Sequence, residues 1–412
     1  MKNYSKLTPE GTKDLLFEES VANEKIAETL ASVYHGRGFN KVSTPGIEFY
    51  DVFAMPEAAI PMENMFKFSD SKGRLVVVRP DSTLPIARMA ATRLKNEPYP
   101  IRLYYTQRVY ISNPVLTGRS NEIMQSGIEL IGAKGKRADL EVITTATQAL
   151  NKLIKRKYIS DFRLELGHAG FFKALVRKLN ITESEREDIR SFIEAKNYSA
   201  LNSMLDNLQP SKAVEAIRRL PRLFGGAEVL DEASALCEDE ETRRPLEYLK
   251  EIFNDLKKCI SDKQIIIDLG LVQRNDYYSD IVFSGYVEGS GEPVLVGGRY
   301  DRLLENFGRP APSSGFAINV NALASIMVRD EKKLPKHTPQ VLVYGEEGYE
   351  TEAVRFTQSL LEDEQSPIGT HHRRVIAENS VADTYEEALQ YAKERGIHRL
   401  AVVGQEIKWI EV

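Results

Sequence analysis

Polar side chains that suit a small ligand gather in three short stretches of the chain. The first, VVRPDSTLP, begins in an apolar strand, and the second, MQSGIEL, alternates like a strand. The third combines NDYYSDIVF with VGGRYDRLL. Together these stretches supply Arg79, Asp81, Thr83, Gln125, Gly127, Glu129, Asp276, Tyr277, Tyr278, Arg299, Tyr300 and Asp301.

The chemistry that this set supports is the recognition of a cationic group. Gln125, Gly127 and Glu129 alternate, so they face one side of a predicted sheet. An amide oxygen and a carboxylate both accept hydrogen bonds from an ammonium, and tyrosines beside a glycine-lined wall suit a small amphipathic ligand. The alternative is that these side chains satisfy one another inside an antiparallel sheet. Spacing alone leaves both interpretations open.

Other motifs predict structure rather than chemistry. His168 stands between apolar residues in LGHAGFF, which favours a hydrogen-bonded packing residue over a catalytic one. GSGEPVLVGGRYD is rich in glycine, but no lysine follows the glycines as in a phosphate-binding loop. Cys237 and Cys259 are not in a zinc spacing. We therefore expect neither a metal nor a cofactor.

Composition limits the partners of the protein. The chain has 412 residues, of which 42% are hydrophobic and 28% charged, with a formal net charge of -5. That length allows two or three domains, and an acidic balance disfavours nucleic acid as the main partner. The N-terminal residues lack the apolar core of a signal peptide, and no apolar run approaches the ~20 residues that span a bilayer. Few cysteines are typical of a reducing compartment, so we expect a cytoplasmic protein without a membrane partner.

Two domains are expected to position the candidate residues. Residues 1–330 form an α+β pattern that contains a charged, Leu-rich helical insertion at about 170–262. A charged linker follows near 331–338, and residues 338–412 alternate strands and helices as a small α/β domain. Within the first domain, a helix begins with Asp81 or Ser82 as its N-cap.

Five motifs occur in the order RPDST, QSGIELIG, LVQRNDYY, VGGRYDRL and GFAINVNAL. They resemble R-P-E-G-T, Q-x-G-x-E-x-x-G, L-V-R-G-L-D-Y-Y, G-G-R-Y-D-x-L and G-F-A-x-G-x-E-R-L of histidyl-tRNA synthetase, a class II aminoacyl-tRNA synthetase. The resemblance covers about residues 7–327. It implies a class II antiparallel sheet flanked by helices, and residues 338–412 resemble a reduced anticodon-binding domain.

The resemblance also implies a histidine-binding site. The positions that match the family's histidine-binding motifs are Asp81, Thr83, Gln125, Gly127, Glu129, Tyr277, Tyr278 and Tyr300. The ligand ammonium would meet Asp81, Gln125 and Glu129, and its imidazole would lie near the tyrosines. Asp81 is one methylene shorter than the glutamate of the family.

Arginines of the synthetase pattern are replaced by neutral residues. Ile111 and Asn113 stand for the arginine and glutamate of the F-R-x-E loop in motif 2, while Gln273 and Ala322 replace the arginines of L-V-R-G and motif 3. Activation of an amino acid by ATP develops charge on phosphates, and losing one preorganised donor typically costs ~100-fold or more in rate. We therefore predict no catalytic residues and no synthetase activity.

One group of synthetase paralogues similarly matches the histidine-binding motifs without the arginines for ATP, namely the regulatory subunits of ATP phosphoribosyltransferase. LTPEGTKDLL resembles the opening of that group, and ELGHAGFFKAL with LPRLFGGAEVL resembles its insertion. The resemblance implies an allosteric role in the first step of L-histidine biosynthesis, with the short-form catalytic subunit as partner and histidine as feedback effector. It also implies a homodimer within a hetero-octamer.

Two alternatives remain at the level of sequence. One is a divergent histidyl-tRNA synthetase, which the neutral positions disfavour. The other is a tRNA-binding pseudo-synthetase regulator, which the acidic balance and the short C-terminal module disfavour.

Overall fold

The computed structural model describes residues 4–55, 60–114, 118–237, 239–272, 277–329, 338–362 and 375–412. The chain divides into two compact units, Met1–Leu334 and Pro335–Val412. Within the described ranges, every helix is too short or too polar to cross a bilayer.

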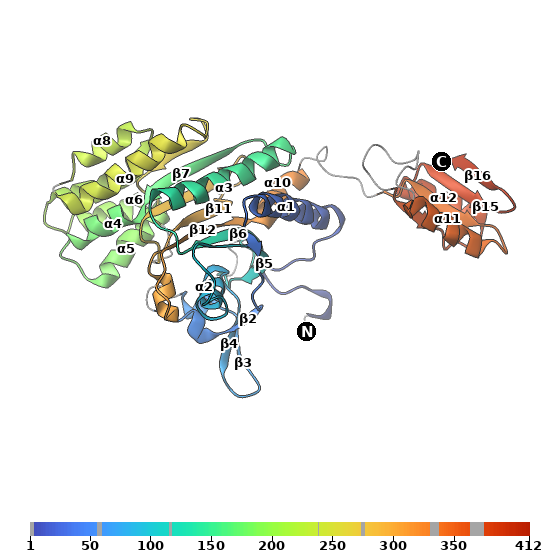
Figure 1. The fold of residues 1–412 in the computed structure, drawn as a ribbon, viewed down its shortest axis with the longest axis horizontal. Coiled ribbons are helices and arrows are strands. Elements are labelled where there is room, and N and C mark those ends of the chain that lie inside the picture. Colours follow the sequence, from blue (N-terminus) through green and yellow to red (C-terminus); the bar gives the residue numbers. More distant parts are fainter. Residues whose placement is uncertain are drawn as a thin grey trace. The chain divides into compact units, whose positions relative to one another are not determined.

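The centre of the first unit is a sheet with the strand order β1-β5-β6-β12-β11-β10-β7-β9-β8 (Figure 1). Neighbouring strands run antiparallel except in the β1–β5 and β7–β9 pairs. The strands are β1 (Asn40–Lys41), β5 (Ile101–Tyr110), β6 (Glu122–Ile131), β7 (Phe162–His168), β8 (Phe224–Gly225), β9 (Ile265–Asp268), β10 (Ile281–Val287), β11 (Leu295–Arg299) and β12 (Ser313–Asn319). This mainly antiparallel sheet confirms the predicted α+β class.

Helices α1 (Phe17–Gly36), α3 (Lys136–Lys155) and α10 (Val320–Arg329) cover one face of the sheet. The alternation of β6 explains why this face is apolar, since Ile128 and Leu130 belong to the core beneath the helices. Glu129, between them, points to the opposite face. One short strand therefore contributes both to the main core and to the candidate site.

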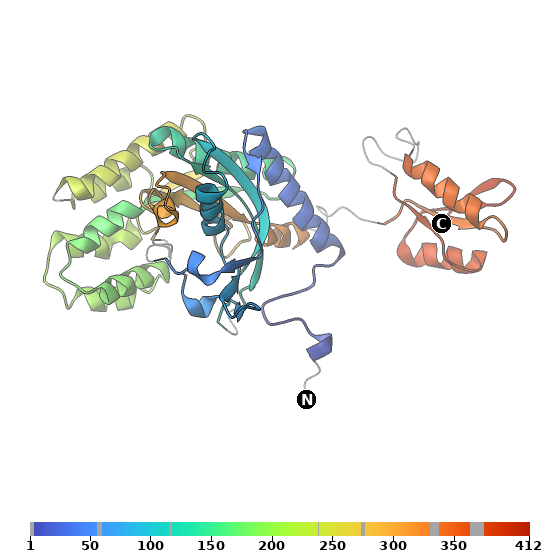
Figure 2. The same cartoon turned by 60° about the horizontal axis from the view of Figure 1, so that its bottom comes forward.

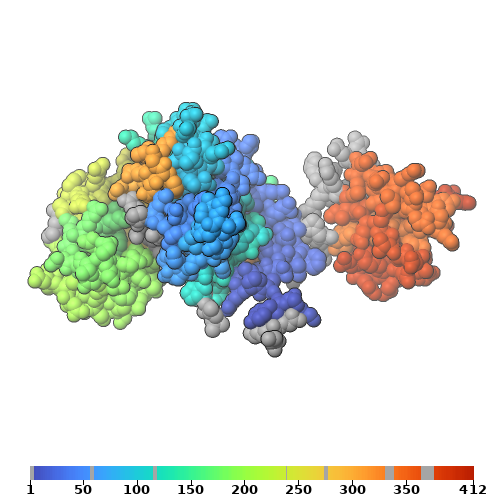
Figure 3. All heavy atoms as spheres, turned by 90° about the horizontal axis from the view of Figure 1, so that it is seen from below, coloured from blue at the N-terminus to red at the C-terminus, as the bar shows by residue number. Residues whose placement is uncertain are grey.

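The opposite face carries α2 (Thr83–Thr92) and a small sheet with the order β2-β4-β3. The strands of that sheet are β2 (Ile47–Phe49), β3 (Lys67–Ser69) and β4 (Leu75–Val78). A second apolar cluster on this face includes Leu84, Tyr105 and Tyr300. In Figure 3 the blue residues of this part lie near the centre of the visible face of the first unit, beside the green insertion.

The helical insertion lies between β7 and β9 and gathers at one end of the sheet, away from α1 (Figure 2). It contains α4 (Ala169–Arg177), α5 (Glu183–Glu194), α6 (Tyr198–Leu205), α7 (Lys212–Arg219), α8 (Glu228–Ser234) and α9 (Glu240–Leu256). Local sequence signals set its helix starts, as Thr182 and Glu185 form a capping box at α5. Short 3-10 helices of the first unit are η1 (Tyr4–Lys6), η2 (Tyr50–Val52), η3 (Met62–Asn64), η4 (Leu220–Arg222) and η5 (Leu303–Phe307).

The second unit is a small α/β module with the strand order β14-β13-β15-β16. Its elements are β13 (Val341–Gly345), α11 (Glu350–Glu362), β14 (Ala377–Asn379), α12 (Tyr385–Arg395), β15 (Arg399–Val403) and β16 (Ile407–Glu411). Strand β13 pairs in parallel with β14 and β15, and β16 adds an antiparallel edge. This confirms the predicted small C-terminal α/β fold.

Candidate functional site

A small cavity lies between the central sheet, the start of α2 and the residues before β10. Its volume is about 90 Å³. Its lining comprises Asp81, Thr83, Gln125, Glu129, Tyr277, Tyr278, Val296, Tyr300, Gly315, Phe316 and Ala317. The fold thus brings together side chains that sequence analysis selected from three distant stretches. The described lining contains no basic side chain.

Glu129 is the most buried acid of this cavity, with 2% of its surface exposed. The Thr83 hydroxyl donates to its Oε1 at 2.8 Å, and the Tyr300 hydroxyl donates to its Oε2. Burial raises the pKa of Glu129 to about 8, although these two hydrogen bonds lower it. Glu129 is therefore largely protonated at neutral pH, and a cation placed beside it would favour the carboxylate form.

Asp81 brings a second carboxyl group to the cavity from the start of α2. Ser82 occupies the N-cap position, but the capping hydrogen bond is made by Asp81, whose Oδ1 accepts from the Leu84 amide at 2.8 Å. Burial raises the pKa of Asp81, while the amides of this first turn lower it. Gln125 Oε1 lies 3.4 Å from the Ser82 hydroxyl, so the helix start orients both acceptors.

Three tyrosine rings form an aromatic wall of the cavity. The ring centroids of Tyr277 and Tyr278 lie 4.8 Å apart, and those of Tyr277 and Tyr300 lie 5.6 Å apart in an edge-on arrangement. Such tilted contacts hold flat rings in fixed positions. Gln273 and Asp276, which precede this wall in sequence, lie outside the described residues.

Gly127, a predicted site residue, and Tyr105 are not among the residues that line the cavity, but Gly127 lies against Phe316 of its wall. Gly127 is paired with Tyr105 across the β5–β6 ladder. A Cβ at position 127 would lie 2.1 Å from the Phe316 carbonyl oxygen and 2.8 Å from the Tyr105 hydroxyl. That hydroxyl is buried and has no hydrogen-bond partner among the described residues. Tyr105 was missed by sequence analysis, because only the cross-strand register places it opposite a glycine.

Arg79 does not point into the cavity. Its guanidinium donates to the backbone carbonyls of Thr44, Pro45 and Arg108 at 2.7, 2.8 and 2.6 Å. A buried guanidinium that bridges three carbonyls braces the small sheet against β5. Arg79 is therefore a structural residue.

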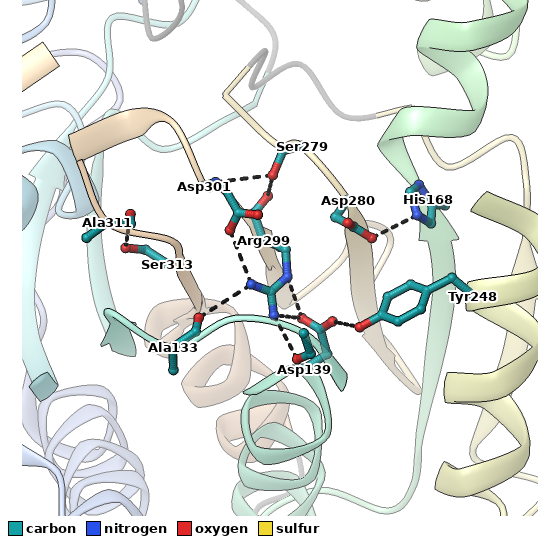
Figure 4. A network of polar contacts seen from close by, with 11 residues as sticks. Ala133, Asp139, His168, Tyr248, Ser279, Asp280, Arg299, Asp301, Ala311 and Ser313 are labelled. Carbon is teal, nitrogen blue, oxygen red and sulfur yellow. Dashed lines mark hydrogen bonds and ion pairs between the residues drawn. The ribbon is translucent and has the colours of Figure 1, made fainter. Parts of the chain in front are cut away.

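Arg299 also lies away from the cavity and anchors the strand that leads to Tyr300 (Figure 4). Its guanidinium meets the Asp139 carboxylate at 2.6 Å, and both side chains are 2% exposed. Asp139 accepts a further hydrogen bond from Tyr248 of α9, while Arg299 also pairs with Asp301 at 3.2 Å. This network ties the insertion, α3 and β11 together and fixes the position of the aromatic wall.

His168 is a packing residue, which confirms the sequence prediction. Its Nδ1 accepts from the Gly170 amide at 3.1 Å at the start of α4. Its Nε2 lies 2.8 Å from the Asp280 carboxylate, and the side chain is 7% exposed (Figure 4).

At the positions that match the motif 2 loop of a synthetase, the described residues on the two sides of the turn bond each other. The Asn113 amide donates to Asn121 Oδ1 at 3.0 Å, and the Asn113 side chain donates to the Ser120 carbonyl at 2.9 Å. Ile111 is half-buried beside this turn, and Ala322 is half-buried in α10. These groups satisfy their hydrogen bonds internally.

Arginines near this turn have carboxylate partners of their own. Arg108 pairs with Glu122 of the neighbouring strand, and Arg119 pairs with Glu292 at 2.8 Å. Both arginines are thus engaged with carboxylates of the chain in this structure.

Comparison with known proteins places this architecture in a family. Residues 11–323 match the histidyl-tRNA synthetase family model. An ATP phosphoribosyltransferase regulatory subunit from Clostridium botulinum strain Langeland is 38% identical over 400 residues, which cover 96% of this chain and 92% of the relative. The chain belongs to the ATP phosphoribosyltransferase regulatory subunits. A regulatory subunit from Clostridium kluyveri is 36% identical over 98% of this chain and its own full length.

Solved structures agree with membership in the regulatory-subunit family. A crystal structure from Bacillus halodurans C, described as an ATP phosphoribosyltransferase regulatory subunit/histidyl-tRNA synthetase, has a TM-score of 0.82 and 28% identity, and covers 98% of this chain and all of its own. Histidyl-tRNA synthetase from Nostoc sp. PCC 7120 shares the fold, with a TM-score of 0.75 at 19% identity over 98% and 97% of the two chains. The predicted regulatory, non-catalytic class is confirmed by these family names.

Proposed function

We propose that this chain supports the activity of a short-form ATP phosphoribosyltransferase subunit and reports histidine to it through the cavity around Glu129. The observation that carries the proposal is the cavity itself, whose described polar lining is rich in acceptors and hydroxyls. Such a site favours an amino acid with a cationic head and a ring that accepts hydrogen bonds.

The lining suggests how histidine would lie. Its ammonium would meet Asp81, Gln125 and Glu129, with the Thr83 hydroxyl next to it. Its imidazole would lie against Tyr277, Tyr278 and Tyr300, where a phenol can hydrogen-bond a ring nitrogen. The unsatisfied Tyr105 hydroxyl offers one further group beside Gly127. Ligand binding would then complete hydrogen bonds that the protein alone leaves open.

Assembly would follow the class II core. The segment 38–53, GFNKVSTPGIEFYDVF, corresponds to the pairing motif of that core, and its strand β2 exposes Ile47 and Phe49 by 52% and 44%. We expect this apolar edge to be covered in a homodimer, which would pair with catalytic subunits in a cytoplasmic hetero-octamer. Light scattering of the chain alone should show a dimer or larger, and a stable monomer at micromolar concentration would contradict this arrangement.

The two domains on either side of the linker would have different roles. Residues 1–330, with the insertion at about 170–262, would carry sensing and assembly, and residues 338–412 would be a reduced anticodon-binding domain without its RNA. Across 338–412 there are 14 acidic and 7 basic residues. Phosphate contacts require basic side chains, so this balance counts against tRNA binding.

Reconstitution with a short-form catalytic subunit tests the proposal. Phosphoribosyl transfer from phosphoribosyl pyrophosphate to ATP should require both chains, and added histidine should inhibit it. A complex that assembles but is indifferent to histidine would contradict sensing. A catalytic subunit that is equally active alone would contradict the regulatory role.

A further inference from the structure

A second, larger cleft shares Tyr277 and Tyr278 with the histidine cavity and extends along α4 and α5 of the insertion. Its volume is about 530 Å³, within the ~300–1,000 Å³ of small-molecule sites. Its charged lining consists of Lys173, Arg177, Arg186, Arg190 and Arg302 against Glu183 and Glu187. Basic groups therefore dominate this cleft in a chain whose formal net charge is -5.

One of these cations is already neutralised by its surroundings. Arg190, whose side chain is 8% exposed, forms ion pairs with Glu187 and, at 2.8 Å, with Glu194. The guanidinium itself is buried and has two carboxylate partners, which together hold it in place. Arg190 and Glu187 therefore belong to the frame of the cleft.

The other guanidiniums are more exposed than Arg190, and Arg302 pairs with the exposed Glu305 at 3.6 Å. Arg186 pairs with Glu183 at 2.9 Å, and that glutamate is 86% exposed. Arg177 pairs at 3.2 Å with Glu241, which is 56% exposed. Exposed ion pairs contribute little net free energy because water competes for both groups. A ligand with several anionic oxygens can therefore take over these guanidiniums at small cost.

An unmet hydrogen bond in the same wall also favours an anionic ligand. Arg186 Nε is buried and has no acceptor among the residues that the structure describes. Buried N–H groups of proteins nearly always have a partner, and none of the described residues supplies one here, so this donor is available to an oxygen of a ligand. Lys173 adds positive charge nearby, with its Nζ held 2.8 Å from the Tyr278 carbonyl oxygen.

We propose that this cleft binds a phosphorylated small molecule, with Arg177, Arg186 and Arg302 as its cationic partners. Phosphate oxygens match the planar donor fork of arginine and accept two bonds from one guanidinium. Phe172 and Val176 of α4 line the same cleft and supply apolar surface for the remainder of the ligand. The inference goes beyond histidine sensing, because none of these five side chains lines the histidine cavity.

Calorimetric titration of the full chain with inorganic pyrophosphate tests the proposal. The wild-type chain should bind the probe, and Arg186→Gln combined with Arg302→Gln should weaken binding by about tenfold or more, since charge-assisted bonds to phosphate are strong. The matched control is Arg219→Gln combined with Arg222→Gln, which removes the same two charges from exposed positions of the insertion outside the cleft. Its affinity should stay within about twofold of wild type, because distant exposed charges are screened.

Other results of this titration would contradict or support the proposed anion site as follows. Absence of pyrophosphate binding in the wild type, or equal weakening in cleft and control variants, would overturn the proposal. Melting temperature and histidine binding of the cleft variants should match wild type, so a folding defect is recognised separately. If neither the wild type nor the variants bind histidine while pyrophosphate binding behaves as expected, the proposed histidine sensing is contradicted but the anion site is supported. An RNA oligonucleotide that binds more tightly than pyrophosphate, and loses binding in the cleft variants, would replace the small molecule and overturn its assignment.

Discussion

Two regions of the chain match the amino-acid half and the nucleotide half of a synthetase site, namely the cavity around Glu129 and the turn around Asn113. Their polar groups differ in their surroundings. In the amino-acid half, Glu129, Asp81 and Gln125 face a cavity, and the Tyr105 hydroxyl has no partner in the described chain. In the nucleotide half, Asn113 and Asn121 bond each other, and Arg119 bonds Glu292. Polar groups have partners within the chain in both regions, and what sets the first apart is an acidic cavity beside the Tyr105 hydroxyl.

Under the proposed function, the difference would mean that a fold keeps recognition while losing chemistry. Binding a neutral or cationic head group needs acceptors in a shaped cavity, which the main core holds in place through Arg299 and Asp139. Adenylation needs fixed cations where charge develops on phosphates. A neutral residue such as Ile111, at a position where the synthetase motif has arginine, cannot supply such a cation.

The largest expected effect concerns the nucleotide half. Histidine-dependent exchange of pyrophosphate into ATP by the purified chain should stay at background, because each missing donor lowers the rate by ~100-fold or more. A genuine histidyl-tRNA synthetase assayed in parallel provides the positive control. Exchange clearly above background would show that both halves still act together and would remove the contrast between them.

A smaller effect is expected from filling the amino-acid half. Gly127→Ala places a methyl group 2.1 Å from the Phe316 carbonyl oxygen, so the β6–β12 pair must shift. Overpacking of this kind costs about 1–3 kcal/mol of stability, and the shift should weaken histidine binding more than ~10-fold. Gly291→Ala is the matched control, since its added methyl would meet open space. Equal histidine affinity in the two variants would show that the ligand lies elsewhere.

The most gradual effect is the pH dependence of stability that Glu129 contributes in the amino-acid half. The pKa of Glu129 is about 8 in the folded protein against a reference value of 4.5, so the native state keeps a proton that the unfolded chain loses. The free energy of unfolding should therefore decrease between about pH 5 and 8, and Glu129→Gln should reduce that slope by up to about 1.4 kcal/mol per pH unit. Urea unfolding across this range measures both slopes. Parallel curves would mean that Glu129 is ionised in the folded protein at neutral pH.

Sequence patterns could predict the positions of candidate residues when a single strand or a single helix start determines them. The alternation of Gln125 and Glu129 places them on one face, and the Pro turn before α2 brings Asp81 to its start. The same alternation explains why Arg299 does not line the cavity, because it precedes Tyr300 and points to the other side of the sheet. Spacing could not reveal Tyr105, since its position depends on the register between two strands. Nor could it show that Arg79 binds three carbonyls, because those lie in distant segments.

The most direct test of the account is histidine inhibition of the reconstituted complex that carries Glu129→Ala. Removal of the carboxylate leaves the bound ammonium with Asp81 as its only remaining acid in the described lining, and breaking a desolvated pair costs about 3–5 kcal/mol. Even half of that would weaken histidine binding more than ~10-fold. Glu122→Ala, on the same strand but paired with Arg108 at the surface, is the control and should behave like wild type. The account predicts relief of inhibition with uninhibited activity and assembly largely unchanged, whereas unchanged inhibition in a folded, assembled Glu129→Ala complex would contradict it.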